Sequence, residues 1–185
     1  MSIKAKYCNN YFKKIYSSSN SIKDSEFELL VRLIESSQKS KNKIIFVGNG
    51  GSASIASHLT IDCINAANLR AVNFNDPEMI TCLSNDYGYE NWIGKALGFY
   101  ADKGDILVLI SSSGQSENML VAAKMAKKLK IKVVTLTGFS SDNPLRRQGD
   151  LNLWSESNEY NIVEMTHHIW LLSAIDYIIE KNKEI

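Results

Sequence analysis

Side chains that could move a proton to or from a substrate are concentrated at two places in the sequence. His58 and Asp62 are four residues apart, and Glu164, His167 and His168 fall close together much later in the chain. An i,i+4 spacing puts His58 and Asp62 on one face of a helix, where an imidazole and a carboxylate can act as general acid and base. The plainer alternative is a surface ion pair, with one later histidine in the core and the other in solvent.

Two loops rich in glycine and serine each follow an apolar run. GNGGSASIASH, residues 48–58, comes directly after KIIFV, and SSSGQSEN, residues 111–118, comes directly after DILVLI. Serine hydroxyls beside a helix N-terminus bind an anion without lysine, because free backbone N–H groups and the helix dipole supply positive potential. We therefore expect a ligand with one phosphate. The alternative is that the serines only cap helices and form turns.

Other phosphate and nucleophile motifs do not fit these loops. GNGGSA can be read as the dinucleotide fingerprint G-x-G-x-x-A, but the acidic residue that would hold the ribose is missing: Asp76 falls late and precedes a proline. Neither loop has the Gly-Lys-Ser/Thr step of a P-loop, and a G-x-S-x-G nucleophile elbow is absent from the sequence.

The elements that must carry these loops alternate between short apolar strands and helical segments from Lys43 onward. Strands are predicted at 43–47, 71–74, 105–110, 132–138 and 151–154, and helices at 53–66, 79–85, 91–101, 117–129 and 161–181. This alternation predicts an α/β fold with three αβα layers, in which a mainly parallel sheet lies between helices. Ligands of such folds bind at the carboxyl ends of the strands, where both loops are expected.

The first forty residues have a different pattern, with apolar residues at helical spacing over 5–16 and 24–40. We therefore divide a single domain, residues 1–185, into an N-terminal helical pair, 1–40, and an α/β core, 41–185. The N-terminal and last helices offer more apolar surface than one sheet can cover, which favours oligomerisation through helices.

Composition excludes several partners. The formal net charge is +1, with 21 Lys+Arg and 20 Asp+Glu spread along the chain, so the basic surface of a nucleic-acid-binding protein is missing. No apolar run approaches the roughly 20 residues that cross a membrane. Cys8, Cys63 and Cys82 lack C-x-x-C spacing, and the N-terminal stretch has neither a signal core nor a lipidation pattern. We expect a cytoplasmic protein that acts on a small molecule.

Three motifs together resemble a known family. GNGGSASIASH, CLSNDYGYE and ISSSGQSEN, in this order and at these separations, resemble the sugar isomerase (SIS) domain and, within it, the phosphoheptose isomerase family. The resemblance implies a five-stranded parallel sheet preceded by two helices, and a homotetramer with active sites near subunit interfaces. It also implies isomerisation of sedoheptulose 7-phosphate to glycero-manno-heptose 7-phosphate, a step toward lipopolysaccharide and other surface polysaccharides.

Carried over by position, the resemblance also implies the site residues. The positions that would bind the sugar phosphate are Asn49, Gly50, Gly51, Ser52, Asn85, Asp86, Ser111, Ser112, Ser113, Ser116 and Glu164. Asp62 matches the family's base, and His58, Asp62 and Glu164 match positions that can contact zinc. The resemblance leaves open whether zinc is bound. A set this rich in carboxylates would hold the ion less selectively than one with two histidines.

The sequence departs from the family where an acid histidine is expected. Leu172 or, in a second alignment, Leu171 stands at that position, so His167 or His168 would have to supply the acid from one turn earlier. Asp62 is also one methylene shorter than the family's glutamate. The alternative function is therefore a non-catalytic SIS module that binds a sugar phosphate, or a protein partner such as the replication initiator.

Overall fold

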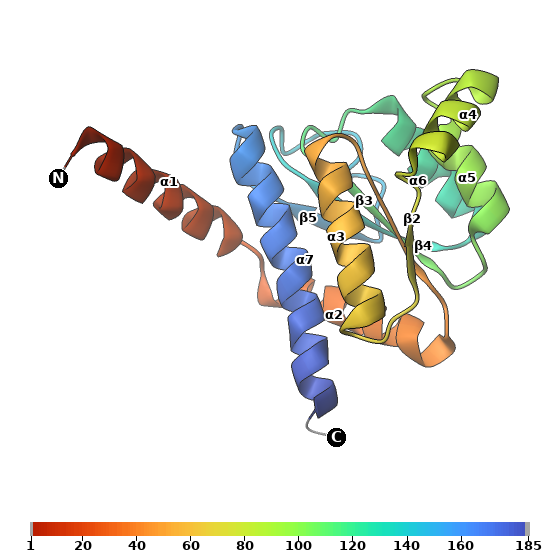
Figure 1. Ribbon diagram of the computed structural model, residues 1–185, viewed down its shortest axis with the longest axis horizontal. Helices are drawn as coiled ribbons and strands as arrows, with labels where there is room; N and C mark the ends of the chain where they lie inside the picture. Colours follow the sequence, from red (N-terminus) through yellow and green to blue (C-terminus); the bar gives the residue numbers. More distant parts are fainter. Residues whose placement is uncertain (1, 184–185) are drawn as a thin grey trace.

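The computed structural model describes residues 2–183, which form one five-stranded sheet with helices on both faces (Figure 1). The strands are β1 (Ile44–Gly48), β2 (Ala71–Asn73), β3 (Ile106–Ser111), β4 (Lys132–Thr137) and β5 (Leu151–Trp154). The helices are α1 (Ile3–Ser19), α2 (Asp24–Ser40), α3 (Gly51–Asn65), α4 (Pro77–Tyr87), α5 (Trp92–Tyr100), α6 (Glu117–Leu129) and α7 (Tyr160–Lys183). The strand order is β2-β1-β3-β4-β5, and every neighbouring pair is parallel.

The central strands are buried on both faces, which explains their uninterrupted apolar runs. Successive side chains of a strand point to opposite faces. Ile44 and Phe46 accordingly pack into one hydrophobic core and Ile45 and Val47 into the other. The α/β fold with three layers and a five-stranded parallel sheet is confirmed.

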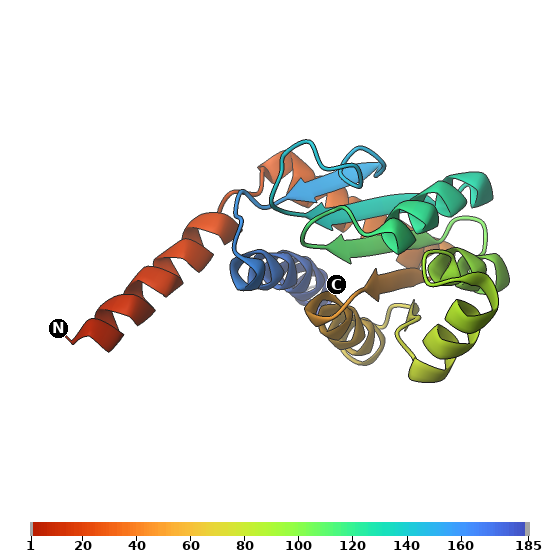
Figure 2. The same ribbon diagram turned by 90° about the horizontal axis from the view of Figure 1, so that it is seen from above.

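The helices divide between the two cores (Figure 2). One core receives apolar side chains from α2, α3 and α7, and the other receives them from α5 and α6. Because α3 and α6 begin at the carboxyl ends of β1 and β3, the two serine- and glycine-rich loops lie at the same edge of the sheet. This edge is where an α/β sheet binds its ligands.

The predicted N-terminal helical pair is present, but its two helices differ in burial. Helix α2 packs Leu30 and Ile34 against the sheet, whereas α1 projects away from the body of the molecule and has no buried residue (Figures 1 and 2). The end of α1 is attached to α7 by a hydrogen bond from Trp170 Nε1 to the Ser19 carbonyl, 2.7 Å long. Most of the remaining residues of α1 are exposed.

A buried ion pair joins the starts of β1 and β3. Lys43 Nζ lies 2.6 Å from carboxylate oxygens of both Asp105 and Asp102. Asp105 is 1% exposed and also accepts the backbone N–H groups of Lys43, at 2.9 Å, and Asp102, at 2.8 Å. Burial lowers the pKa of Lys43, but its hydrogen bonds to the two carboxylates outweigh burial, so the pKa lies above its ordinary value. This pair fixes the edge of the sheet opposite the loops.

Within residues 2–183, no helix combines the length and the apolar character needed to cross a membrane.

Candidate active site

The first loop, between β1 and α3, already faces a carboxylate. Gly51 opens α3, and a Cβ atom there would overlap the carboxylate of Glu164 from α7. Glycine at this position therefore lets Glu164 approach the N-terminus of α3, where a negative charge is favourable. Burial raises the pKa of Glu164. With Glu164 in place, a phosphate bound at this loop would meet a like charge.

The second loop, between β3 and α6, has hydroxyls that the protein itself does not use. Ser112 is 5% exposed, and its buried Oγ has no hydrogen-bond partner among the described residues. Ser116 is the N-cap residue of α6, yet its side chain makes no capping hydrogen bond. Ser113 does act in the turn, because its Oγ accepts the Gln115 N–H at 3.3 Å. A buried hydroxyl without a partner is costly, and the N-terminus of α6, which begins directly after this loop, is favourable for an anion.

A pair of asparagines connects the two loops. Asn49 and Asn118 exchange two side-chain hydrogen bonds, of 3.1 and 3.0 Å, and Tyr89 donates its hydroxyl to Asn49 Oδ1 at 3.2 Å. Asn118 and Tyr89 were not among the predicted site residues. Tyr89 lies in the motif CLSNDYGYE and Asn118 in the motif ISSSGQSEN. The motifs could have indicated both residues, but only the folded structure shows that they contact Asn49.

The other predicted substrate residues are placed as follows. Ser52 is buried in the first turn of α3, and Gly50 precedes it as the N-cap residue. Ser111 ends β3. Asn85 and Asp86 are exposed on α4, where their side-chain hydrogen bonds run to each other and to Cys82 rather than to either loop.

His58, Asp62 and His168 form a chain of hydrogen bonds between α3 and α7. His168 Nε2 lies 2.9 Å from His58 Nδ1, and His58 Nε2 lies 3.2 Å from Asp62 Oδ2. When the Nε2–H group of His58 donates a hydrogen bond to Asp62, the unprotonated Nδ1 of His58 can accept a hydrogen bond from the Nε2–H group of His168. Burial lowers the pKa of His168, His58 lowers it further, and Asp62 opposes the change. This arrangement can carry a proton between a carboxylate and an imidazole.

His167 is not brought to this cluster. It is fully buried, and its Nε2 donates to the Thr137 carbonyl at 3.0 Å, while its Nδ1 has no partner among the described residues. Burial lowers the pKa of His167 to about 4, despite the opposing hydrogen bond to Thr137. His167 is therefore a neutral core residue at physiological pH. Adjacent helix positions point about 100° apart, which explains the different surroundings of His167 and His168.

The depressed pKa of His167 predicts acid sensitivity of the fold. Between pH 6.5 and about 4, His167 is protonated in the unfolded chain but stays neutral in the folded chain. The free energy of unfolding therefore falls as the pH falls through this range. We expect the free energy of unfolding to drop by about 2 kcal/mol between pH 7 and pH 5 from this group. Urea unfolding of the wild type and of His167→Gln, which keeps a donor to Thr137 but cannot titrate, measures the difference. An equal pH dependence in both proteins would contradict the assignment.

The residues predicted to hold zinc do not form one site. Glu164 lies against Gly51, whereas Asp62 lies eleven residues, or about 16 Å of helix rise, further along α3. The part of the chain from residue 2 to residue 183 contains no group of three or more His, Cys, Asp or Glu side chains arranged to hold a metal ion. In this structure His58, Asp62 and Glu164 are therefore not gathered at one point. Zinc binding by this set stays a prediction that metal analysis of the purified protein tests.

The leucines at the family's acid position are part of the packing. Leu171 is 2% exposed and lies in the core between α7 and the sheet, and Leu172 is partly buried against the same core. His168, one turn earlier than Leu172, is the histidine of α7 that contacts α3. The structure thus places an imidazole near the expected position without using position 171 or 172.

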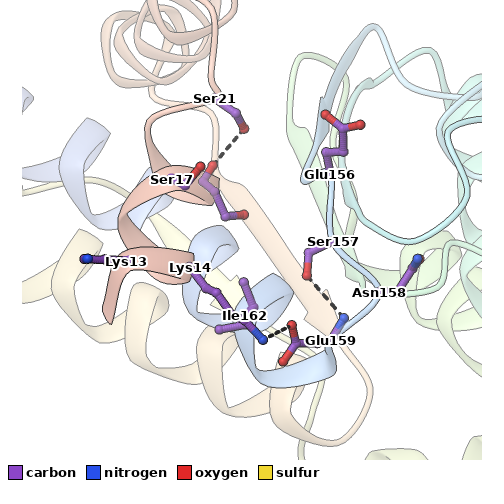
Figure 3. Close-up of a pocket in the computed structure, with 10 residues that line it drawn as sticks. Lys13, Lys14, Ser17, Ser21, Glu156, Ser157, Asn158, Glu159 and Ile162 are labelled. Atoms are coloured by element: carbon purple, nitrogen blue, oxygen red, sulfur yellow. Dashed lines mark hydrogen bonds and ion pairs between the residues drawn. The ribbon is translucent and has the colours of Figure 1, made fainter. Parts of the chain in front are cut away.

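A polar cavity lies apart from these groups (Figure 3). It has a volume of about 650 Å³ and separates the end of α1 from the segment that precedes α7. Its lining consists of Lys13, Lys14, Ser17, Ser18, Ser21, Glu156, Ser157, Asn158, Glu159 and Ile162. An ion pair of 2.7 Å between Lys14 and Glu159 crosses it. None of its lining residues comes from the two loops or the histidine cluster, so it is not the candidate active site.

Comparison with known proteins identifies the class to which this fold and these loops belong. The family model of the SIS domain matches residues 7–138, and the chain belongs to the SIS domain family. Within it, the chain belongs to the phosphoheptose isomerase family, as its relatives show. A phosphoheptose isomerase of Helicobacter pylori is 36% identical over 159 residues, which cover 82% of this chain and 81% of that protein.

Two further comparisons define how far the similarity extends. A phosphoheptose isomerase of Akkermansia muciniphila is 34% identical over 119 residues, and the match covers 61% of this chain but only 63% of the relative, less than two thirds of its length. The solved structure of a phosphoheptose isomerase from Francisella tularensis superposes with a TM-score of 0.86 at 28% identity, covering 98% of this chain and 100% of that one. The fold therefore extends over nearly all of the chain.

Proposed function

We propose that this protein is a sugar-phosphate isomerase that interconverts sedoheptulose 7-phosphate and an aldose heptose 7-phosphate. The observation that carries the proposal concerns the serines of the second loop. The buried Ser112 hydroxyl lacks a hydrogen-bond partner among the described residues, and the Ser116 hydroxyl makes no capping hydrogen bond to α6. These groups, next to the N-terminus of α6, suit one phosphate dianion. The relatives named phosphoheptose isomerase support the choice of sugar.

The proposed reaction moves protons between two carbons and two oxygens of the sugar. A base removes a proton from C1, and an acid protonates the C2 carbonyl oxygen to give an enediol. Return of a proton to C2, with loss of one from the C1 hydroxyl, gives the aldose. We assign the base to Asp62 and the acid to His168, because His58 joins the two through hydrogen bonds.

The direct test is turnover of sedoheptulose 7-phosphate, followed by NMR for the aldose product. Formation of a heptose 7-phosphate supports the proposal. Tight binding without turnover would instead favour the sugar-phosphate-binding module, for which the leucines at 171 and 172 are the motivating observation. A protein that neither turns over nor binds the sugar phosphate would contradict both functions.

Serine substitutions in the second loop test the phosphate site separately from catalysis. Replacing Ser113 or Ser116 with alanine removes a hydroxyl donor to a charged acceptor, a contact worth about 1.5–3 kcal/mol. We expect the affinity for sedoheptulose 7-phosphate, measured by calorimetry, to fall about tenfold or more. Ser25→Ala, at an exposed position of α2, serves as control and should bind like the wild type. Unchanged affinity in both loop variants would place the phosphate elsewhere.

We also propose that the enzyme is a homotetramer with active sites near subunit interfaces. Helix α1 has no buried residue and exposes the apolar side chains of Ile3, Tyr7, Phe12 and Tyr16. Helix α3 exposes Ile61 and Ile64 next to Asp62. Apolar surface of this kind is typical of subunit contacts. Sedimentation equilibrium tests the assembly, and a monomer at micromolar concentration would contradict it.

A further inference from the structure

The segment that follows β4 is fastened to the second loop at two points. The Gly138 N–H donates to the Ser112 carbonyl at 2.8 Å, and the Leu145 N–H donates to the Gly114 carbonyl at 3.1 Å. The intervening residues therefore lie directly against the loop. They form a support that comes from a different part of the sequence than the loop itself.

Asn143 is the centre of this support. Its side chain is 2% exposed, and its Nδ2 group donates to Thr137 Oγ1 at 3.1 Å and to the Ser140 carbonyl at 2.8 Å. Its Oδ1 accepts the Arg146 N–H at 2.9 Å. A buried amide with this many partners fixes the local backbone, because losing any partner leaves a polar group unsatisfied.

The Asn143 amide also touches the loop. Gly114 has a φ of +63°, and a Cβ atom there would overlap Oδ1 and Cγ of Asn143. The Gly114 N–H closes the turn of the loop on the Ser111 carbonyl at 3.1 Å. The position of the Asn143 amide therefore limits where the backbone between Ser111 and Ser116 can lie.

We propose that Asn143 is a positioning residue that holds the second loop in its phosphate-binding conformation. The inference rests on the proposed function, since it requires the phosphate to bind at this loop. The serine hydroxyls and the N–H groups of α6 must converge on one dianion, and a hydrogen bond weakens steeply with misalignment. Without the Asn143 side-chain amide, the backbone at Gly114 can take other conformations, and the serine hydroxyls and N–H groups then no longer point at one phosphate.

Asn152 provides a matched control. Its side-chain amide is likewise hydrogen-bonded at both ends: Oδ1 accepts from Thr135 Oγ1 at 2.8 Å and from the Gly149 N–H at 3.0 Å, and Nδ2 donates to the Gly149 carbonyl at 3.0 Å. These partners lie in β4 and in the turn before β5, and none belongs to the second loop. Asn143→Ala and Asn152→Ala should therefore lower the thermal midpoint in a similar way while differing in their effect on binding.

The experiment measures binding of sedoheptulose 7-phosphate by calorimetry, together with steady-state kinetics. We expect Asn143→Ala to weaken binding about tenfold and to raise KM with little change in kcat, and Asn152→Ala to bind within about twofold of the wild type. Asn143→Ser, which keeps a hydroxyl for the turn, should lie between the wild type and the alanine variant. It also serves as the test variant if alanine prevents folding.

The possible failures are distinguishable. If Ser116→Ala weakens binding but both Asn143 variants bind like the wild type, the positioning role is wrong and the phosphate site stands. Equal weakening by Asn143→Ala and Asn152→Ala would mean a general loss of stability and would also overturn the role. If the wild type does not bind the sugar phosphate, the proposed function fails, and the inference fails with it.

Discussion

Replacing His168 with alanine is expected to lower kcat by about 10²- to 10⁴-fold and to leave KM almost unchanged. The reason is geometric. His168 is the end of the hydrogen-bonded chain that passes through His58 to Asp62, so its removal takes away the proposed acid while both loops stay intact. Steady-state kinetics with sedoheptulose 7-phosphate, and calorimetry for its binding, measure the two effects.

The neighbouring histidine is the control for this prediction. His167→Gln should keep kcat within a few-fold of the wild type, because His167 is fully buried and bonded to the Thr137 carbonyl rather than to the cluster. If the His168→Ala enzyme remains fully active, the acid is misassigned and Glu164 becomes the next candidate. If His167→Gln is the inactive variant and remains folded, the assignment of roles to the two histidines is reversed.

Replacing Asp105 with alanine is expected to destabilise the protein by about 3 kcal/mol. The substitution leaves Lys43, whose side chain is 10% exposed, with only the carboxylate of Asp102. It also removes the acceptor of two backbone N–H groups, those of Lys43 and Asp102. Urea unfolding at a fixed protein concentration measures the change, because subunit association would otherwise contribute to the apparent stability.

Asp102→Ala is the matched control for the buried carboxylate. The Asp102 side chain is 75% exposed and lies at the same 2.6 Å distance from Lys43 Nζ. An exposed ion pair contributes at most about 1 kcal/mol, so this variant should remain close to the wild type. A similar loss of stability in both variants would show that burial of Asp105 is not what makes the pair important.

The elements of the fold were predictable because each has its own local pattern. The helix predicted at 117–129 coincides with α6, and its start at Ser116 is a preferred N-cap residue. The helix predicted at 79–85 is longer at both ends and begins at Pro77, because Asp76 caps it and proline suits the first turn. Asp76 followed by Pro77 is a capping signal that the sequence itself contains.

The candidate site was predictable only in part. The serines of the second loop follow from composition and position, but the contact between His58 and His168 joins residues 110 positions apart, which no local pattern indicates. Helix phase is the signal in the sequence that separates the two adjacent histidines. His167 shares its face with the apolar Val163, Trp170 and Ala174, and this phase indicates the core. The role of Asn143 depends on contacts with Gly114 that only the tertiary structure reveals.

The close approach of Gly51 and Glu164 has a consequence for how this sequence can evolve. A side chain at position 51 would displace the Glu164 carboxylate, which is the flexible end of a long side chain and can turn away at low cost. A larger residue at position 51 would therefore move this carboxylate away from the N-terminus of α3. Descendants of this chain that keep the carboxylate against the first turn of α3 are therefore expected to keep glycine at position 51.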